Sequence, residues 1–291
     1  MNGNVILRNM RRVKIALVSR YVFDNWCSLL IEYLLVKYIL ARFGFSVKLK
    51  TVISGRAIEV SLEVFERLTS RILSRYVLGW RYDNSCDCWV RGNVRFKQWH
   101  NSIRDVFDYG HWDGLNVEDK VVVDVGAFIG DSSIYFALRG ARRVIAVEPH
   151  PEAYKVMVEN IRLNGLEDVI TPVNAGLSSR PGVICVKNVD VEGMYRTYHG
   201  LSECSTTVPA ITLADIIDKY NVGRDVVLKM DCEGCEYDVI LNDYEHVKLF
   251  NEIAVECYEG ATGKLLKVLV RDYNCSHVAR YSVVYCTRKR V

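Results

Sequence analysis

The sequence has almost no excess of charge of one sign. Its 38 lysines and arginines nearly balance its 35 aspartates and glutamates, which leaves a formal charge of +3 over 291 residues. The basic residues are scattered, apart from a short cluster from Arg288 to Arg290. Because binding to a nucleic-acid backbone normally requires a basic patch, the composition predicts no nucleic-acid partner.

Long uncharged hydrophobic runs are also missing. The most apolar stretch, from Trp26 to Phe45, contains Glu32, Lys37 and Arg42. That pattern is typical of a core-facing helix and not of a transmembrane span, although a helix on a membrane surface stays open as an alternative. The first residues, MNGNVILRNMRRVKIALV, carry arginines within the apolar part and no small-residue cleavage site. We therefore expect no secretory signal and a cytoplasmic location.

Ten cysteines occur in a chain long enough to build a hydrophobic core without disulfides. Because no secretory signal is predicted, we expect most of them to be reduced thiols. Cys232 and Cys235 have the spacing of a redox or metal-binding pair, but no second pair and no nearby histidine completes a zinc site. We predict no metal site. Whether this pair, or Cys86 with Cys88, forms a disulfide as in hyperthermophile proteins stays open.

From about Lys120 onward, short β-branched runs alternate with segments of helical length. This alternation predicts an α/β fold in which helices cover both faces of a mostly parallel sheet. The predicted strands are VVVDV, RVIAVE, VITPVN, DVVLKMD and EIAVEC, and the predicted helices begin near Ser132, Pro151, Thr212, Tyr237 and Gly263. The final stretch, SHVARYSVVYCTRKRV, has two strand-like runs with no helix between them, which predicts an antiparallel hairpin.

The pattern before Lys120 is weaker, and it shows no internal repeat and no low-complexity linker. The predicted elements are the strand KIALV, a helix over 26–42, the strands VKLKTV and AIEVSL joined around Ser54 and Gly55, a helix over 64–76 and a strand over 94–97. The change of pattern places a domain boundary near residue 105. We predict an N-terminal α+β extension of unknown role over 1–105 and the sheet domain over 106–291.

The stretch VVVDVGAFIGD has the form of a ligand-binding turn. Gly126 and Gly130 let the backbone approach a ligand between a strand and the next helix. Phe128 occupies the place of the middle glycine in G-x-G-x-x-G, so the turn is not the dinucleotide fingerprint. A tight turn without a ligand is the alternative on this stretch alone. Glu148 strengthens the ligand interpretation. Its spacing from Asp124 along the sequence is about that of an acid that binds the ribose of a nucleoside.

Two motif blocks stand in order along this half of the chain. The first is VVVDVGAFIGDSSIYFALRGARRVIAVEPHPEAYKVMVENIRLNG, and the second is TLADIID followed by VVLKMDCEGCEYDVI. Together they resemble the FkbM family of class I S-adenosylmethionine-dependent methyltransferases, whose K-x-D-x-E-G-x-E segment is similar to the second block. The resemblance covers roughly residues 105 to 260. It implies a Rossmann-like class I methyltransferase sheet, methyl transfer and S-adenosylmethionine as cofactor.

The resemblance also implies a cofactor site at the ends of the first three strands. Its members are Asp124, Gly126 and Gly130 beside the methionine part, Asp131 as the cap of the following helix, Glu148 on the ribose diol and Asn174 near the adenine. The place of Phe128 does not count against this site, since the family pattern also lacks the third glycine.

Lys229, Asp231, Glu233 and Glu256 are the candidates for catalysis. Lys229 and Asp231 lie on the same side of a strand, where a buried lysine needs carboxylate partners. Asp231 or Glu233 at the sheet edge would orient or deprotonate an acceptor hydroxyl, and a purely structural ion-pair network is the alternative. Glu256 projects from the same edge. With Asp231 it could bind a divalent cation, a weaker hypothesis than hydrogen bonding because two carboxylates are too few.

Aromatic and histidine side chains supply weaker candidates. His111 and Trp112 precede the first core strand, where a segment can fold over a cofactor, although a lone histidine there is more often structural. Tyr195, Tyr198 and His199 fall in a long segment that can line an acceptor pocket.

The resemblance implies O-methylation of a sugar, lipid-linked or secondary-metabolite acceptor. An RNA (tRNA) methyltransferase is the first alternative, because VENIRLNG is similar to tRNA-modifying enzymes. DCEG, however, stands where those that act on nitrogens carry an N-P-P-Y-like turn. A non-catalytic cofactor-binding or scaffold protein is the second alternative, and the intact Asp124, Glu148 and Asp231 argue against it.

Overall fold

The computed structural model describes residues 25–38, 48–53, 56–61, 75, 78–191, 194–197, 204, 206–257 and 262–290. The chain divides into two compact units, Met1–Tyr82 and Asp83–Val291. Some predicted features lie outside the described residues: the strand KIALV, the helix over 64–76 except Arg75, the joint at Ser54 and Gly55, and Tyr198 and His199.

The first unit contains helix α2 (Trp26–Tyr38) and the antiparallel strands β1 (Lys48–Ile53) and β2 (Arg56–Ser61). Leu29, Tyr33 and Val36 recur at helical spacing on the buried side of α2. The predicted helix is thus confirmed as far as Tyr38, and both predicted strands are confirmed. No helix within the described ranges is long and apolar enough to cross a membrane.

The second unit is built on a seven-stranded sheet in the order β15-β16-β14-β13-β6-β7-β8. Its strands are β6 (Val121–Val125), β7 (Arg143–Val147), β8 (Ile170–Val173), β13 (Val226–Met230), β14 (Glu252–Glu256), β15 (Tyr273–Val278) and β16 (Val283–Arg288). The first five are mutually parallel, whereas β16 pairs antiparallel with both β14 and β15. The mostly parallel sheet and its C-terminal hairpin are confirmed.

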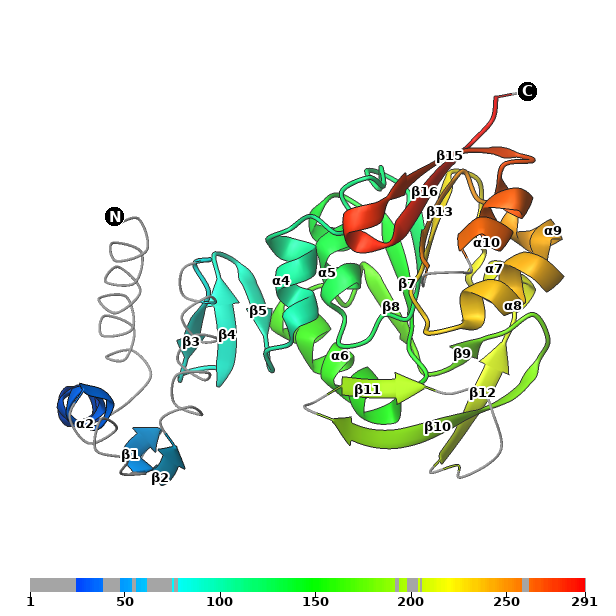
Figure 1. Cartoon of the computed structure of the whole chain (residues 1–291). Coiled ribbons are helices and arrows are strands. Elements are labelled where there is room, and N and C mark those ends of the chain that lie inside the picture. The colour runs from blue at the N-terminus through cyan, green and yellow to red at the C-terminus, as the bar shows by residue number, and fades with distance from the viewer. Residues whose placement is uncertain are drawn as a thin grey trace, which may run out of the picture. The chain divides into compact units, whose positions relative to one another are not determined.

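Helices cover both faces of this sheet, with α4 to α6 on one side and α7 to α10 on the other (Figure 1). They are α4 (Asn101–Phe107), α5 (Asp131–Leu138), α6 (Pro151–Leu163), α7 (Leu213–Tyr220), α8 (Cys235–Asn242), α9 (Tyr244–Val247), α10 (Thr262–Leu269) and the short 3₁₀ turn η2 (Ala279–Tyr281). The predicted start of α7 is confirmed, since Thr212 and Asp215 form a capping box.

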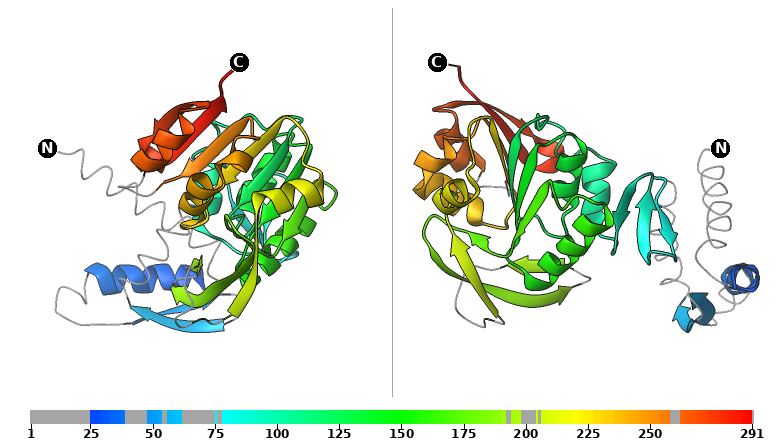
Figure 2. Two further views of the ribbon diagram at one scale, coloured as in Figure 1. Left: turned by 90° about the vertical axis from the view of Figure 1, so that its right-hand side faces the viewer. Right: turned by 180° about the vertical axis from the view of Figure 1, so that it is seen from behind.

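Two smaller sheets were not predicted as such. One has the order β11-β10-β12-β9, with β9 (Gly176–Leu177), β10 (Gly182–Val191), β11 (Met194–Thr197) and β12 (Thr206–Ile211) (Figure 2). The other pairs β3 (Arg81–Asp83), β4 (Cys88–Arg91) and β5 (Val94–Phe96), of which only β5 matches a predicted strand. The sheet that contains β10 has a small hydrophobic core of its own, formed by Ile184, Val186, Val208 and Ala210.

The prediction that most cysteines are reduced is wrong. The disulfides are Cys86–Cys88, Cys185–Cys204, Cys232–Cys235 and Cys275–Cys286, and Cys27 and Cys257 are free. Two of these bonds join cysteines that are distant in sequence: Cys275 and Cys286 are direct partners across the β15–β16 ladder, and Cys185 and Cys204 are 19 positions apart. The other two are the local pairs that the sequence left open.

Candidate active site

The turn that follows β6 adopts backbone conformations that favour glycine. Gly126 has a φ of +74° and Gly130 a φ of +86°, both in the left-handed region. A Cβ on Gly126 would stand 1.7 Å from the backbone oxygen of Asp231. The turn therefore lies directly against the segment that follows β13, at the point where the strand order reverses and α/β sheets bind their ligands.

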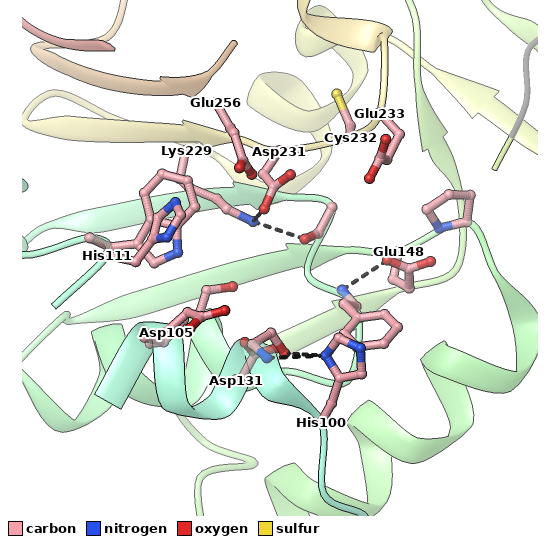
Figure 3. Close-up of a pocket in the computed structure, with 17 residues that line it drawn as sticks. His100, Asp105, His111, Asp131, Glu148, Lys229, Asp231, Cys232, Glu233 and Glu256 are labelled. Atoms are coloured by element: carbon pink, nitrogen blue, oxygen red, sulfur yellow. Dashed lines mark hydrogen bonds and ion pairs between the residues drawn. The ribbon is translucent and has the colours of Figure 1, made fainter. Parts of the chain in front are cut away.

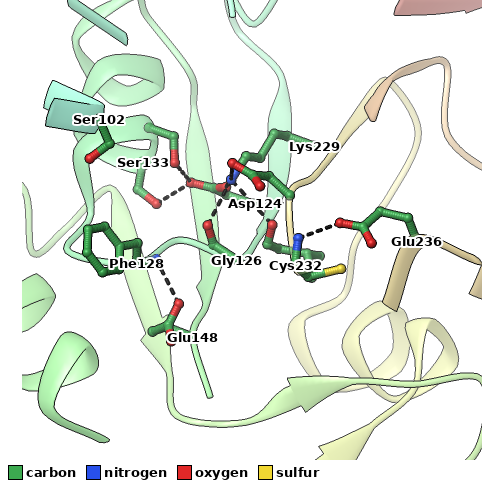
Figure 4. Close-up of polar contacts among 12 residues, drawn as sticks. Ser102, Asp124, Gly126, Phe128, Ser133, Glu148, Lys229, Cys232 and Glu236 are labelled. Carbon is green, nitrogen blue, oxygen red and sulfur yellow. Dashed lines mark hydrogen bonds and ion pairs between the residues drawn. The ribbon is translucent and has the colours of Figure 1, made fainter. Parts of the chain in front are cut away.

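Asp124 and Lys229 form a buried ion pair behind this turn. The two residues are direct partners in the parallel register of β6 and β13, and Lys229 Nζ lies 3.0 Å from Asp124 Oδ1. Asp124 Oδ2 accepts hydrogen bonds from the hydroxyls of Ser132 and Ser133 (Figure 4). Burial alone would lower the pKa of Lys229, but the carboxylates of Asp124 and Asp231 outweigh it and raise that pKa. Lys229 therefore stays charged inside the protein.

Two carboxyl groups lie at the same edge of the sheet. Asp231 follows β13 and Glu256 ends β14, and both line the cavity. Burial raises the pKa of Glu256, and the charge of Asp231 raises it further. The protonated form of Glu256 is therefore favoured, and Lys229 Nζ lies 4.0 Å from the carboxylate of Asp231. Glu233, two residues on, is exposed and has a φ of +58°.

Glu148 closes the other end of the turn. Its carboxylate accepts hydrogen bonds from the backbone N–H of Phe128, at 2.8 Å, and of His150, at 2.7 Å. Burial raises the pKa of Glu148 to about 7 in spite of these two donors. The amide of Asn174 donates to the backbone oxygens of Glu148 and Pro149. Asn174 therefore fixes the end of β7, and its predicted place near an adenine stays a prediction.

Asp131 does not cap helix α5 as predicted. The N-cap is Gly130, which has no side chain to donate or accept, and Asp131 is the first residue of the helix. Asp131 is 4% exposed. Burial raises the pKa of Asp131 to about 7.

These residues surround a cavity of about 260 Å³ at the carboxyl ends of the central strands (Figure 3). The predicted residues that line it are Gly126, Asp131, Glu148, Lys229, Asp231, Glu233 and Glu256. Asp124, Gly130 and Asn174 are not in the lining and instead support residues that are. In the part of the chain that the structure describes, no group of three or more histidine, cysteine or acidic side chains is arranged to hold a metal ion.

The segment around α4 supplies the opposite wall of the cavity. His100, Ser102 and Asp105 line it from this segment, and no sequence motif pointed to them. His111 and Trp112, the weaker candidates, also line it. Burial lowers the pKa of His111, and the ring of Trp112 lies 5.1 Å from Lys229 Nζ. This wall of the cavity is thus built by residues that precede the first core strand.

The cavity fits S-adenosylmethionine on three counts. Gly126 lines the cavity, so backbone atoms of the turn are within reach of a ligand there. Each oxygen of Glu148 uses one lone pair on a backbone N–H, and a carboxylate has about four acceptor sites, so both ribose hydroxyls can still donate to it. The acidic side chains of Asp231 and Glu233, which line the cavity, favour the cationic sulfonium group.

Cofactor affinity is expected to rise with pH because Asp131 and Glu148 both titrate near 7. Burial raises the pKa of both carboxyl groups in the folded protein above their pKa in the unfolded chain. Their contribution to the stability of the fold is therefore complete below about pH 4 and is lost as pH rises through 7. Binding of the ribose diol needs the ionised form of Glu148, whose oxygens then accept from both hydroxyls. Affinity for S-adenosylhomocysteine should therefore increase between pH 6 and pH 8, by up to about tenfold. Calorimetry in two buffers of different ionisation enthalpy would detect the released protons; equal affinities without proton release would contradict this.

The comparisons with known proteins agree with this geometry. A family model, the methyltransferase FkbM domain, matches residues 124–272. The chain is 26% identical over 159 residues to the hexuronic acid methyltransferase AglP of Haloferax volcanii, which covers 55% of this chain and 64% of AglP. It is 42% identical over 77 residues to the ribosomal protein L11 methyltransferase of Geobacter sp. (strain M21), which covers 26% of this chain and 25% of that enzyme.

A solved structure of a methyltransferase FkbM from Methylobacillus flagellatus KT also aligns with the chain. The alignment has a TM-score of 0.43 and 15% identity, and covers 98% of this chain and 60% of that one. The chain thus spans less than two thirds of the length of each of these three relatives.

A mostly parallel seven-stranded sheet with a C-terminal antiparallel hairpin, and a glycine turn facing a buried acid at its switch point, define the class I methyltransferase fold. Within that class the family model matches half of the chain, and the chain belongs to the FkbM methyltransferase family.

Proposed function

We propose that this chain transfers a methyl group from S-adenosylmethionine to a hydroxyl oxygen of a sugar, lipid-linked or secondary-metabolite acceptor. The observation that carries the proposal is the pair of Asp231 and Glu256 in the lining of the cavity, with Lys229 Nζ 4.0 Å from Asp231. An ionised carboxylate held next to a proton donor is a positioned base for a hydroxyl group. The relative AglP, named as a hexuronic acid methyltransferase, supports a sugar as acceptor.

In this mechanism the chain positions two reactants and removes one proton. When bound, S-adenosylmethionine supplies an electrophilic methyl carbon. Asp231 accepts a hydrogen bond from the acceptor hydroxyl and takes its proton as the new oxygen–carbon bond forms. Glu256 donates its hydrogen bond to the other side of Asp231 and keeps that carboxylate in one orientation. Lys229 stays bound to Asp124 and fixes the strand ends, so orientation supplies much of the rate.

The cofactor part of the proposal is tested by replacing Glu148. Glu148→Ala removes both acceptor oxygens for the ribose diol and should weaken S-adenosylhomocysteine binding about 10- to 100-fold, since hydrogen bonds to a charged group are the strong ones. Glu152→Ala is the matched control, because Glu152 is an exposed acid on the next helix whose partner is Lys155. Calorimetry measures both. Wild-type affinity in Glu148→Ala, or no saturable binding by the wild-type chain, would refute the proposed cofactor site.

The acceptor part is tested by label transfer. Purified protein with methyl-labelled S-adenosylmethionine should label hydroxyl-bearing saccharides, glycolipids or polyketide alcohols, and the label should survive mild alkali because an ether, unlike an ester, is stable to it. Transfer confined to tRNA or to protein would overturn the hydroxyl acceptor. Salt-sensitive tRNA binding would point to the same conclusion.

A further inference from the structure

The turn after β13 is closed by a disulfide directly beside the cavity. Cys232 and Cys235 are bonded, with their Cα atoms 5.5 Å apart. Cys232 is half-buried and lines the cavity, whereas Cys235 is buried and begins helix α8. Glu233 and Gly234, which the bond encloses, both have positive φ values, +58° and +128°. The disulfide therefore holds an unusual backbone conformation next to the proposed base, Asp231.

This turn also forms part of the wall on the cofactor side. The Cα of Cys232 lies 3.2 Å from the position that a Cβ on Gly126 would take. The backbone N–H of Asp231 donates to the oxygen of Val125 at 3.1 Å. Because the two turns pack without a side chain between them, a displacement of the Cys232 turn changes the space that the cofactor occupies.

Glu236 is the second restraint on the same turn. It is 1% exposed, and its carboxylate accepts hydrogen bonds from the backbone N–H of Cys232, at 2.5 Å, and of Gly234, at 2.7 Å (Figure 4). Burial raises the pKa of Glu236 against these donors. Once the disulfide is open, this one carboxyl group would have to hold the turn by itself, and the loss of the covalent link would leave more conformations accessible.

We propose that Cys232 and Cys235 form a thiol–disulfide exchange site that sets the affinity of the chain for its cofactor. With the bond intact, the turn is held against Gly126 and the cofactor binds tightly. With the bond reduced by a dithiol, the turn relaxes and binding weakens. The inference rests on the proposed cofactor site, and it assigns a role to the two cysteines that methyl transfer does not use.

The exchange step balances with one dithiol as the reductant. A thiolate of the dithiol attacks Sγ of the accessible Cys232, the S–S bond breaks, and its electron pair leaves on Sγ of Cys235. The second thiol of the reductant then closes its own disulfide and releases Cys232 as a thiol. Two electrons pass to the protein and one dithiol is oxidised. Cys235 is a suitable leaving group because it is the first residue of α8, where the helix dipole favours a thiolate.

The test measures S-adenosylhomocysteine affinity by calorimetry, which requires no acceptor. Wild-type protein purified without reductant should bind about tenfold more tightly than the same protein reduced with dithiothreitol, since ordering a few side chains on binding has a cost of that size. Cys232→Ser/Cys235→Ser should bind as weakly as reduced wild type and should not respond to dithiothreitol. Alkylation followed by peptide mass mapping should find Cys232 and Cys235 blocked before reduction and labelled after it.

Cys275→Ser/Cys286→Ser is the matched control, because it removes a disulfide from the hairpin at the far edge of the sheet. It should bind with wild-type affinity and keep the response to dithiothreitol. Equal affinities of oxidised and reduced wild type, or loss of the response in the control variant alone, would overturn the exchange site while leaving the proposed function intact. Absence of binding in every state would refute both.

Discussion

Asp231→Asn is expected to lower kcat by about 10²- to 10⁴-fold, the usual contribution of a positioned general base. Asparagine keeps the shape of the side chain but cannot take the proton of the acceptor hydroxyl. Affinity for S-adenosylhomocysteine should stay within about threefold, since the proposed diol ligand is Glu148 and not Asp231. Steady-state kinetics with the acceptor found by label transfer, together with calorimetry, would separate the two effects.

Glu256→Gln is the informative companion to this variant. Because the protonated form of Glu256 is favoured, a glutamine amide can replace it as the donor to Asp231, and kcat should fall by less than about tenfold. The variant with the larger decrease in kcat shows which carboxyl group is the base. If Glu256→Gln were severe and Asp231→Asn mild, the proton would start on Asp231 and the assignment of the base would be reversed.

The core of the fold could be predicted from the sequence because each central strand has a local signature. β6 and β13 are buried along their whole length, and runs such as VVVDV have that continuous apolar pattern. The turns between strands and helices carry their own signals, such as the capping box at Thr212. The sheet that contains β10 was missed because Ile184, Cys185 and Val186 are all buried, so the strand lacks the alternation that marks a half-buried strand.

The two disulfides between distant cysteines could not be predicted because they depend on tertiary neighbours, whereas Cys86–Cys88 and Cys232–Cys235 are local pairs that the sequence left open. Cys185 and Cys204 are 19 positions apart in sequence, and nothing local brings them together. The same reason applies to the wall of the cavity formed by Ser102 and Asp105. These residues sit in a short helix whose only local signal is the buried pair Ile103 and Val106, and only the packing of α4 beside α5 brings them to the site.

The sequence predicts where the acidic residues of the site lie, but it does not predict which of them are protonated. Their positions after strands put them at one edge of the sheet, as parallel strands require. Whether a carboxyl group is ionised depends on its burial and on its neighbours in space, and the sequence shows neither of these. Asp231 and Glu256 follow or end adjacent strands, yet burial raises the pKa of Glu256, a direction that the sequence does not show.

Lys229→Met is expected to reduce the free energy of unfolding by about 3–5 kcal/mol, because it leaves the charge of Asp124 buried without its cation. Both side chains are almost inaccessible, 2% for Lys229 and 0% for Asp124. The hydroxyls of Ser132 and Ser133 remain as donors, but they carry no charge to offset the carboxylate. Urea unfolding at pH 7 without reductant would measure the change.

Two further variants separate the buried charge from the loss of a lysine as such. Lys155→Met removes an exposed lysine paired with Glu152 and should cost no more than about 0.5 kcal/mol, as surface pairs do. Asp124→Asn/Lys229→Met removes both buried charges, while the amide oxygen of the introduced side chain can still accept from the two serines. It should be at least about 1 kcal/mol more stable than Lys229→Met alone. A double variant no more stable than the single one would mean that Lys229 acts through its packing against Trp112 and not through its charge.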